Sequence, residues 1–410
     1  MNIKINPKTL HGKIEAPASK SVAHRILICA ALAKGKSTVK LNKTSDDIEA
    51  TAGCLKALGV TIEKNGNEWA VTPPAEFPQK AELNCKESGS TLRFMLPVVS
   101  ALGIETTFTA EGRLPDRPIA PLLDEMKKHG IVCNDTFPLH ISGKLTGGKF
   151  RIAGNISSQF ITGLLLSLPL CEGESEIEII PPVESKPYID ITTKALSDFG
   201  ADIKENGNVY KVRHSDLQSG DFNVEGDWSN AAFLLSLGSE VSGLDRNSTQ
   251  GDRKILDILL AFGGELIENY GTIRVSLANL HGTEIDASDI PDLVPVISAV
   301  AATADGTTKI YNASRLRLKE SDRIKSTVEM INSLGGEAYE TDDSIIIIGK
   351  KSLSGGTVES FNDHRIVMAA AVASQKCEDC VIIKNAQAVN KSYPEFFKDF
   401  NSLGGDANVM

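Results

Sequence analysis

Charged and hydroxyl side chains are concentrated in seven short segments of this 410-residue chain, several of them at the start of an apolar helical run. In APASKSVAHRIL, Lys20, Ser21 and Arg25 lie at such a start. The free N–H groups of a helix start attract anions, and the added cations favour an oxyanion site over a simple helix cap. In CKESGSTLRF, the small residues from Gly89 onward predict a flexible loop that leads into a helix carrying Arg93, a weaker phosphate signal.

Three further segments add donors for an anion. In EGRLPDRP, prolines stiffen a loop that contains Arg113 and Arg117. The guanidinium groups of these arginines can each form two hydrogen bonds to a carboxylate or a phosphate. The other two segments offer neutral donors, in one case beside a lysine. For the serines and glutamine of the first of these two segments, helix capping is almost as good an explanation as ligand binding. Their residues are Ser157, Ser158 and Gln159 in GNISSQFITG, and Ser185 and Tyr188 beside Lys186 in SKPYIDIT.

The last two segments bring carboxylates among cations. Lys319 and Arg323 are predicted to lie four residues apart on one helical face with Glu320 beside them, and Asp292 precedes another apolar helix. A carboxylate among cations can stay charged near neutrality and still carry a proton when substrate charge arrives. The alternative is a solvated ladder of surface charges. The remaining polar groups are Asp363, His364 and Arg365 before a long helix of small residues, and Lys391 near the end.

Together these segments contain more cations than one phosphate needs, so we expect the ligands to be a pair of anionic small molecules. Asp292 and Glu320 can supply proton transfer. No cofactor motif offers another source of chemistry. The one CxxC, Cys377 with Cys380, lacks a second pair and a nearby His, so neither a metal nor a cofactor is expected.

The elements that position these segments repeat along the chain. Six similar phrases, such as KALGVTIEKNGN and NSLGGEAYETDD, each end a helix-like run with a Gly and continue into alternating strand-like residues, about 70 residues apart. Gly at this position suits a backbone with positive φ, and the following Asn and Gly predict a tight turn between two strands. We therefore predict six copies of one α/β module, grouped into two globular halves of three.

Composition favours a soluble protein of the cytoplasm. Apolar residues make up 41% of the chain, no run is long enough to span a bilayer, and the start lacks a signal-peptide core. Seven scattered cysteines indicate a reducing compartment. A net charge of −10 argues against binding to nucleic acid or to a membrane surface. We expect a monomer with small-molecule substrates.

Ten stretches, in order along nearly the whole chain, are similar to motifs of one known family. They are PASKSVAHR, ESGSTLR, RLPDRPI, ISSQFIT, SKPYIDIT, VEGDWSNAAF, IPDLVPVISA, RLKESDR, NDHRIVMA and NKSYPEFF. On these motifs the chain resembles the 5-enolpyruvylshikimate-3-phosphate synthases, which are 3-phosphoshikimate 1-carboxyvinyltransferases among the enolpyruvyl transferases. The resemblance implies transfer of the enolpyruvyl group of phosphoenolpyruvate to the 5-hydroxyl of shikimate 3-phosphate, with release of phosphate, in aromatic amino-acid biosynthesis by way of chorismate.

The resemblance also implies a two-lobed fold of six βαβαββ units, three per lobe about an approximate threefold axis, with helices inside the lobes. One lobe would comprise residues 1–19 plus 227–410 and contain both termini, and residues 20–226 would form the second. The active site is then expected in the cleft between the lobes.

Residue roles carried over from the family fall into three overlapping sets. Shikimate 3-phosphate would be held by Lys20, Ser21, Arg25, Ser157, Ser158, Gln159, Ser185, Tyr188, Asp292 and Lys319. Phosphoenolpyruvate would be held by Lys20, Gly89, Arg117, Gln159, Glu320, Arg323, Arg365 and Lys391. The reaction would proceed by addition and elimination through a tetrahedral intermediate, with Asp292, Glu320 and Lys20 as the catalytic groups.

Two departures from the family pattern stand out: Glu87 where many members have Asn, and Arg315 where an Asn commonly contacts shikimate 3-phosphate. Two alternative functions follow from the same observations. The enolpyruvyl transferase that acts on UDP-N-acetylglucosamine shares the fold, but it usually has a Cys in the loop that here reads EGRLPDRP. A non-catalytic clamp around a polymer is disfavoured by the net acidity and by the gathering of cations into discrete motifs.

Overall fold

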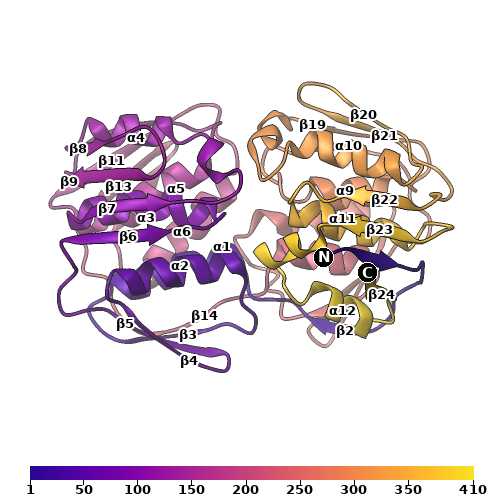
Figure 1. The fold of residues 1–410 in the computed structure, drawn as a ribbon, viewed down its shortest axis with the longest axis horizontal. Helices are drawn as coiled ribbons and strands as arrows, with labels where there is room; N and C mark the ends of the chain where they lie inside the picture. Colours follow the sequence, from indigo (N-terminus) through magenta and orange to yellow (C-terminus); the bar gives the residue numbers. More distant parts are fainter. The chain divides into compact units, whose positions relative to one another are not determined.

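The computed structural model describes residues 1–410 and divides the chain into two compact units. Unit 1 comprises Met1–Pro17 and Glu225–Met410, and unit 2 comprises Ala18–Val224. The chain folds into six four-stranded sheets, three in each unit. Both termini belong to unit 1, where Figure 1 marks them near strand β24.

One module of unit 2 shows how each sheet is built. The first two strands are parallel and joined by a buried helix, and the last two form an antiparallel pair that adds to the second strand, giving the order β6-β7-β9-β8. Its elements are β6 (Lys80–Asn84), α3 (Gly89–Leu102), β7 (Glu105–Thr109), α4 (Ala120–Lys127), β8 (Ile131–Cys133) and β9 (Leu139–Gly143).

The other two modules of unit 2 repeat this βαβαββ pattern. One consists of β10 (Lys149–Ala153), α5 (Ser158–Ser167), β11 (Glu174–Ile180), α6 (Lys186–Asp198), β12 (Ile203–Asn206) and β13 (Val209–Arg213). The other takes its first strand from the far end of the unit, because β14 pairs in parallel with β3. It consists of β14 (Asp221–Asn223), α1 (Lys20–Leu32), β3 (Ser37–Lys40), α2 (Asp46–Ala57), β4 (Thr61–Asn65) and β5 (Glu68–Thr72).

Unit 1 contains three modules, two of which include a strand from the start of the chain. The first consists of β2 (Lys13–Glu15), α7 (Trp228–Ser236), β15 (Glu240–Ser242), α8 (Ile255–Ala261), β16 (Glu265–Asn269) and β17 (Thr272–Ser276). The second consists of β18 (Glu284–Asp286), α9 (Val294–Ala301), β19 (Thr307–Tyr311), α10 (Arg323–Ser333), β20 (Ala338–Glu340) and β21 (Ile345–Ile348). The third consists of β22 (Gly356–Glu359), α11 (His364–Ser374), β23 (Val381–Lys384), α12 (Phe396–Ser402), β24 (Ala407–Val409) and β1 (Ile3–Ile5).

The first helix of each module lies inside its unit, because a helix that is apolar on all sides must be buried. Every residue of α9 and of α11 is buried, as are most residues of α3 and α7. Each unit has its own hydrophobic core around these helices. The predicted α/β fold with six modules and internal helices is confirmed.

The repeated glycines have the conformation predicted from the sequence. All six adopt positive φ, where a side chain would be strained: Gly59, Gly130, Gly200, Gly263, Gly335 and Gly404. Five directly follow the cap residue of a helix, and Gly130 lies one residue further on. None of the helices combines the length and the apolar composition that a membrane-spanning segment needs. All seven cysteines are free thiols.

Candidate functional site

The N-terminal end of α1 carries the first predicted cation. Ser19 caps the helix, its side chain accepting a hydrogen bond from the backbone of Val22. Lys20, the first helical residue, forms an ion pair of 2.8 Å with Asp47 in the first turn of α2, and both side chains are largely buried. The pair holds the Lys20 ammonium group at the helix start, where the free N–H groups also favour an anion.

Arg25 lies one turn deeper and ties three helices of unit 2 together. Its guanidinium donates to the hydroxyl oxygens of Thr192 (2.8 Å) and Thr162 (3.1 Å), which belong to α6 and α5. It also donates to the backbone carbonyls of Ser21 and Tyr188. Burial lowers the pKa of Arg25 to about 9, an effect that Tyr188 partly offsets. Arg25 is therefore a buried brace, meaning that its hydrogen bonds hold the starts of α1 and α6 and the threonines of α5 and α6 in place around the predicted anion site.

A second group forms where α3 and α5 begin. Arg93 donates to the amide oxygen of Gln159 at 2.9 Å and to the carbonyl of Pro118 at 3.0 Å, and Gln159 donates to the Ser90 hydroxyl at 2.9 Å. The guanidinium groups of Arg93 and Arg117 both lie over Gly89. A Cβ at Gly89 would be 2.5 Å from Arg93 Nη1 and 2.8 Å from Arg117 Nη1, so only glycine leaves room for both.

The remaining predicted donors of unit 2 also lie at helix starts. Ser157 caps α5, with its hydroxyl accepting from the Gln159 N–H, and Ser158 is the first residue of that helix. Ser185 precedes α6 with a positive φ of 55°, and Tyr188 lies in the first turn of the same helix. The predicted residues of unit 2 therefore gather at the N-terminal ends of α1, α3, α5 and α6.

Unit 1 contains a compact cluster of charges around Arg323, the first residue of α10. Its buried guanidinium binds three carboxylates: Asp292 at 2.7 Å, Glu320 at 2.6 Å and Asp363 at 2.8 Å. Asp292 also contacts Arg365 Nη2 at 3.0 Å with its second oxygen. The carboxylate of a ligand can therefore replace an internal carboxylate on Arg323 or Arg365 without movement of either arginine.

The pKa values in this cluster follow from burial and from the neighbouring charges. Burial opposes ionisation of Asp292, yet Arg365, Lys319 and Arg323 hold its pKa well below the usual value. For Arg323, burial alone would lower the pKa, but Asp363, Glu320 and Asp292 raise it well above normal. Burial lowers the pKa of Lys319 to about 8, against the opposing effect of Asp292. Asp292 and Arg323 are therefore both ionised near neutral pH.

Two further predicted cations lie beside the same cluster. Arg365 occupies the first turn of α11, whose N-terminus is capped by the Asp363 carboxylate accepting from the Arg365 N–H. Lys391, in the short 3₁₀ helix η5 (Ala386–Lys391), donates to the Asn362 carbonyl at 2.6 Å. Asp363 thus binds Arg323 and fixes the start of α11 at the same time.

Two local predictions were wrong. Lys319 and Glu320 do not share a helical face with Arg323, because Asp322 caps α10 and the helix begins only at Arg323. Lys319 instead ends the 3₁₀ helix η4 (Ser314–Leu318), and Glu320 lies in the connecting loop. Gly89 does not lie in a flexible loop but is the first residue of α3, since the Ser88 side chain caps the helix one residue earlier.

Three partners in these groups were missed from the sequence. Asp47 looks like an ordinary acidic residue in the first turn of a helix, and Thr162 and Thr192 look like helix-interior residues. Nothing local reveals that they bind Lys20 or Arg25. The sequence does indicate where these helices begin, because the capping residues Ser19 and Asp363 precede apolar helical runs.

The structure also places the two departures from the family pattern. The carboxylate of Glu87 lies against Gly112, where a Cβ would be 2.5 Å from its Oε2 atom. Arg315 is buried in η4 and donates to the carbonyl of Ser288. It is therefore not a surface charge.

The six βαβαββ modules define a two-unit α/β fold, and the charged groups at the starts of its buried helices are suited to anionic small molecules. The family model for EPSP synthase (3-phosphoshikimate 1-carboxyvinyltransferase) matches residues 5–400. A 3-phosphoshikimate 1-carboxyvinyltransferase of Clostridium kluyveri is 45% identical, with 98% of this chain and 97% of the relative covered. One of Clostridium novyi is 42% identical, with 98% of each covered.

Solved structures agree with these relatives. The EPSP synthase of Acinetobacter baumannii superposes with a TM-score of 0.82 at 26% sequence identity, over the whole length of both chains. The chain belongs to the EPSP synthase (3-phosphoshikimate 1-carboxyvinyltransferase) family. The resemblance seen in the sequence motifs is thereby confirmed.

Proposed function

We propose that this protein transfers the enolpyruvyl group of phosphoenolpyruvate to the 5-hydroxyl of shikimate 3-phosphate and releases phosphate. Family membership over nearly the full chain supports this reaction over transfer to UDP-N-acetylglucosamine. The observation that carries the chemistry is the cluster in which Arg323 binds Asp292, Glu320 and Asp363. It combines sites for an anionic ligand with carboxylates able to move protons.

The reaction needs two proton transfers in its first half. Asp292 takes the proton of the 5-hydroxyl, and Glu320 or Lys20 gives a proton to the methylene carbon of phosphoenolpyruvate. The hydroxyl oxygen then forms a bond to the central carbon, giving a tetrahedral ketal. In the second half the bond from this carbon to the phosphate oxygen breaks, the methyl group returns a proton to the acid, and the proton taken up by Asp292 passes to the departing phosphate. The surrounding cations stabilise the departing phosphate.

The ion pairs of Asp292 suggest how a weakly basic carboxylate becomes a base. In the free protein Arg323 and Arg365 hold Asp292 ionised and lower its pKa. When the carboxylate of phosphoenolpyruvate binds these arginines, it competes with Asp292 for the same N–H donors. The pKa of Asp292 then rises toward the range needed for proton abstraction. Proton transfer is thus coupled to the arrival of the second substrate.

The other residues serve binding in this proposal. We assign the carboxylate of phosphoenolpyruvate to Arg323 and Arg365, and its phosphate to donors beside the α3 and α5 N-termini and to two lysines: Lys20, Gly89, Arg117, Gln159 and Lys391. Shikimate 3-phosphate is assigned to Lys20, Ser21, Ser157, Ser158, Gln159, Ser185, Tyr188, Asp292 and Lys319. Arg25 supports this second group through its hydrogen bonds to α5 and α6.

Phosphate release from purified protein tests the proposal. The protein is mixed with phosphoenolpyruvate and shikimate 3-phosphate, and parallel reactions contain UDP-N-acetylglucosamine or no acceptor. We expect release only with shikimate 3-phosphate. Release with the nucleotide sugar alone, or with no acceptor needed, would contradict the assignment.

The role of Glu320 is tested with Glu320→Gln, which keeps the size and the hydrogen bond to Arg323 but removes the exchangeable carboxyl proton. We expect substrate dissociation constants within about threefold of wild type and turnover lower by about 10²- to 10⁴-fold, the usual contribution of a general acid. Wild-type turnover in this variant would exclude Glu320 as the acid.

A further inference from the structure

A basic pocket lies in unit 1 at the C-terminal ends of α9 and α11. It has a volume of about 660 Å³ and is lined by three short segments and one lysine: 277–281, 303–305, 349–351 and Lys376. The candidate site occupies the opposite, N-terminal ends of the same two helices, where Asp292 and Arg365 lie. With a rise of about 1.5 Å per residue, the length of α11 separates the two by roughly 15 Å.

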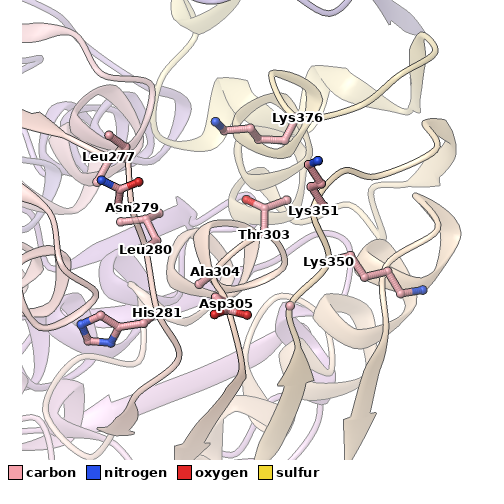
Figure 2. Close-up of a pocket in the computed structure, with 12 residues that line it drawn as sticks. Leu277, Asn279, Leu280, His281, Thr303, Ala304, Asp305, Lys350, Lys351 and Lys376 are labelled. Carbon is pink, nitrogen blue, oxygen red and sulfur yellow. The ribbon is translucent and has the colours of Figure 1, made fainter.

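Three lysines and one aspartate line the pocket, and only Lys350 of the three lysines forms an ion pair, with Glu337. Lys351 and Lys376 are exposed and neither forms an ion pair, in a protein with a net charge of −10. Figure 2 shows Lys376 extending toward the segment of Leu277 and Asn279, and Lys351 pointing toward Lys376. Lys350 points away from them and donates to the carbonyls of Gly335 and Gly336. Two unpaired ammonium groups at one pocket favour an anion, although the side chain of Asp305 also lines it.

Capping of the two helices does not account for these lysines. The Ala302 carbonyl accepts from the Lys350 N–H, and the Lys376 carbonyl accepts from the Leu353 N–H, both at 2.9 Å. Backbone N–H groups likewise satisfy the carbonyls of Ala301 and Ser374. The side-chain ammonium groups of Lys351 and Lys376 therefore keep their hydrogen-bond donors for another partner.

The pocket walls are held in place by the backbone. Asp305 donates its N–H to the Leu280 carbonyl at 2.8 Å, and Gly349 donates to the Gly306 carbonyl at 2.9 Å. A Cβ at Gly349 would lie 1.6 Å from the Ala304 carbonyl oxygen, so the two segments approach as closely as glycine permits. The pocket is thus formed before any ligand binds, which favours specific binding.

We propose that this pocket is a second anion site, which binds a small phosphate- or carboxylate-bearing molecule through Lys351 and Lys376. The amide of Asn279 and the hydroxyl of Thr303 lie in the same pocket and supply neutral donors. Leu277 and Leu280 offer an apolar wall, and the volume exceeds what a single phosphate fills. The ligand therefore has an anionic group at one end and a larger body.

Lysine labelling read by mass spectrometry tests the proposal on the full chain. An amine-acylating reagent is applied briefly with increasing pyrophosphate or, separately, citrate, while sodium chloride keeps the ionic strength constant. Lys13 and Lys309, exposed on strands of the same unit, serve as internal controls. At about ten times the dissociation constant, labelling of Lys351 and Lys376 should fall about tenfold, because only the free fraction reacts.

Protection by pyrophosphate alone would define a phosphate site, and protection by citrate alone a carboxylate site. An equal, small decrease at all four lysines, or no decrease, would overturn the proposal. Binding stoichiometry gives a second test, because pyrophosphate can also enter the candidate active site. The K351Q/K376Q variant should bind one equivalent fewer than wild type, whereas the charge-matched K13Q/K309Q variant should not. Equal stoichiometry in all three proteins would also refute the site.

Discussion

Gly89 is the position at which one added methyl group should weaken phosphoenolpyruvate binding. In Gly89→Ala the new Cβ would meet Arg93 Nη1 at 2.5 Å and Arg117 Nη1 at 2.8 Å, which is 0.9 and 0.6 Å short of the 3.4 Å at which ordinary contact begins. Both guanidinium groups must move. Loss of one charge-assisted hydrogen bond from Arg117 to the ligand costs about 1.5 to 3 kcal/mol. We therefore expect the KM for phosphoenolpyruvate to rise roughly 10- to 150-fold.

Steady-state kinetics with each substrate varied in turn checks this expectation, because the KM for shikimate 3-phosphate should change little. Gly53→Ala is the matched control. Gly53 lies in the interior of α2 with nothing within 4 Å of its Cβ position. Its replacement should leave both KM values unchanged and raise the free energy of unfolding by about 0.5 to 1 kcal/mol. An unchanged KM for phosphoenolpyruvate in Gly89→Ala, or an equal rise for both substrates, would refute the reasoning.

Three further predictions concern the charged groups. Asp363→Asn keeps a good helix cap but removes one of the three carboxylate charges that bind Arg323. We expect urea unfolding to show that the free energy of unfolding falls by about 3 to 5 kcal/mol. A decrease below about 1 kcal/mol would contradict a paired, buried charge. Arg25→Lys cannot bridge Thr162 and Thr192 together, so thermal unfolding should show a loss of about 1 to 3 kcal/mol, while an unchanged melting temperature would count against the brace. Because the pKa of Lys319 is lowered to about 8, its positive charge is lost as pH rises through 8. The KM for shikimate 3-phosphate should therefore increase above that pH in wild type but not in Lys319→Arg, and parallel pH profiles would exclude this group.

Local spacing was enough to predict the modules and the starts of several helices. Each repeated Gly adopts the positive φ that a helix end requires, and this preference depends on the residue itself. Likewise, Ser19 and Asp363 cap helices because a short polar side chain can reach the nearby N–H groups. These features involve residues only a few positions apart, so the sequence displays them directly.

The pairing of charges was not predictable in the same way. Arg25 finds its partners 137 and 167 residues away, on two helices of a different module, and only the packing of the two modules brings them together. The same holds for Arg323 with Asp363, which lies in the next module. The prediction that Lys319 and Glu320 share a helical face with Arg323 was also wrong, because Asp322 caps the helix and so starts it after them. Residue types indicated the chemistry, but only tertiary structure determines which charge meets which.

The position of β1 has a consequence for how the protein is made. This strand lies between β23 and β24, and Ile3 pairs with both Ile383 and Val409. The ribosome therefore synthesises β1 about 380 residues before either neighbour exists. Unit 2 is continuous in sequence and can fold while synthesis proceeds, whereas the first strand of unit 1 must wait without a partner. Residues Ile3–Ile5 are thus made long before both partner strands and are among the last to enter a sheet.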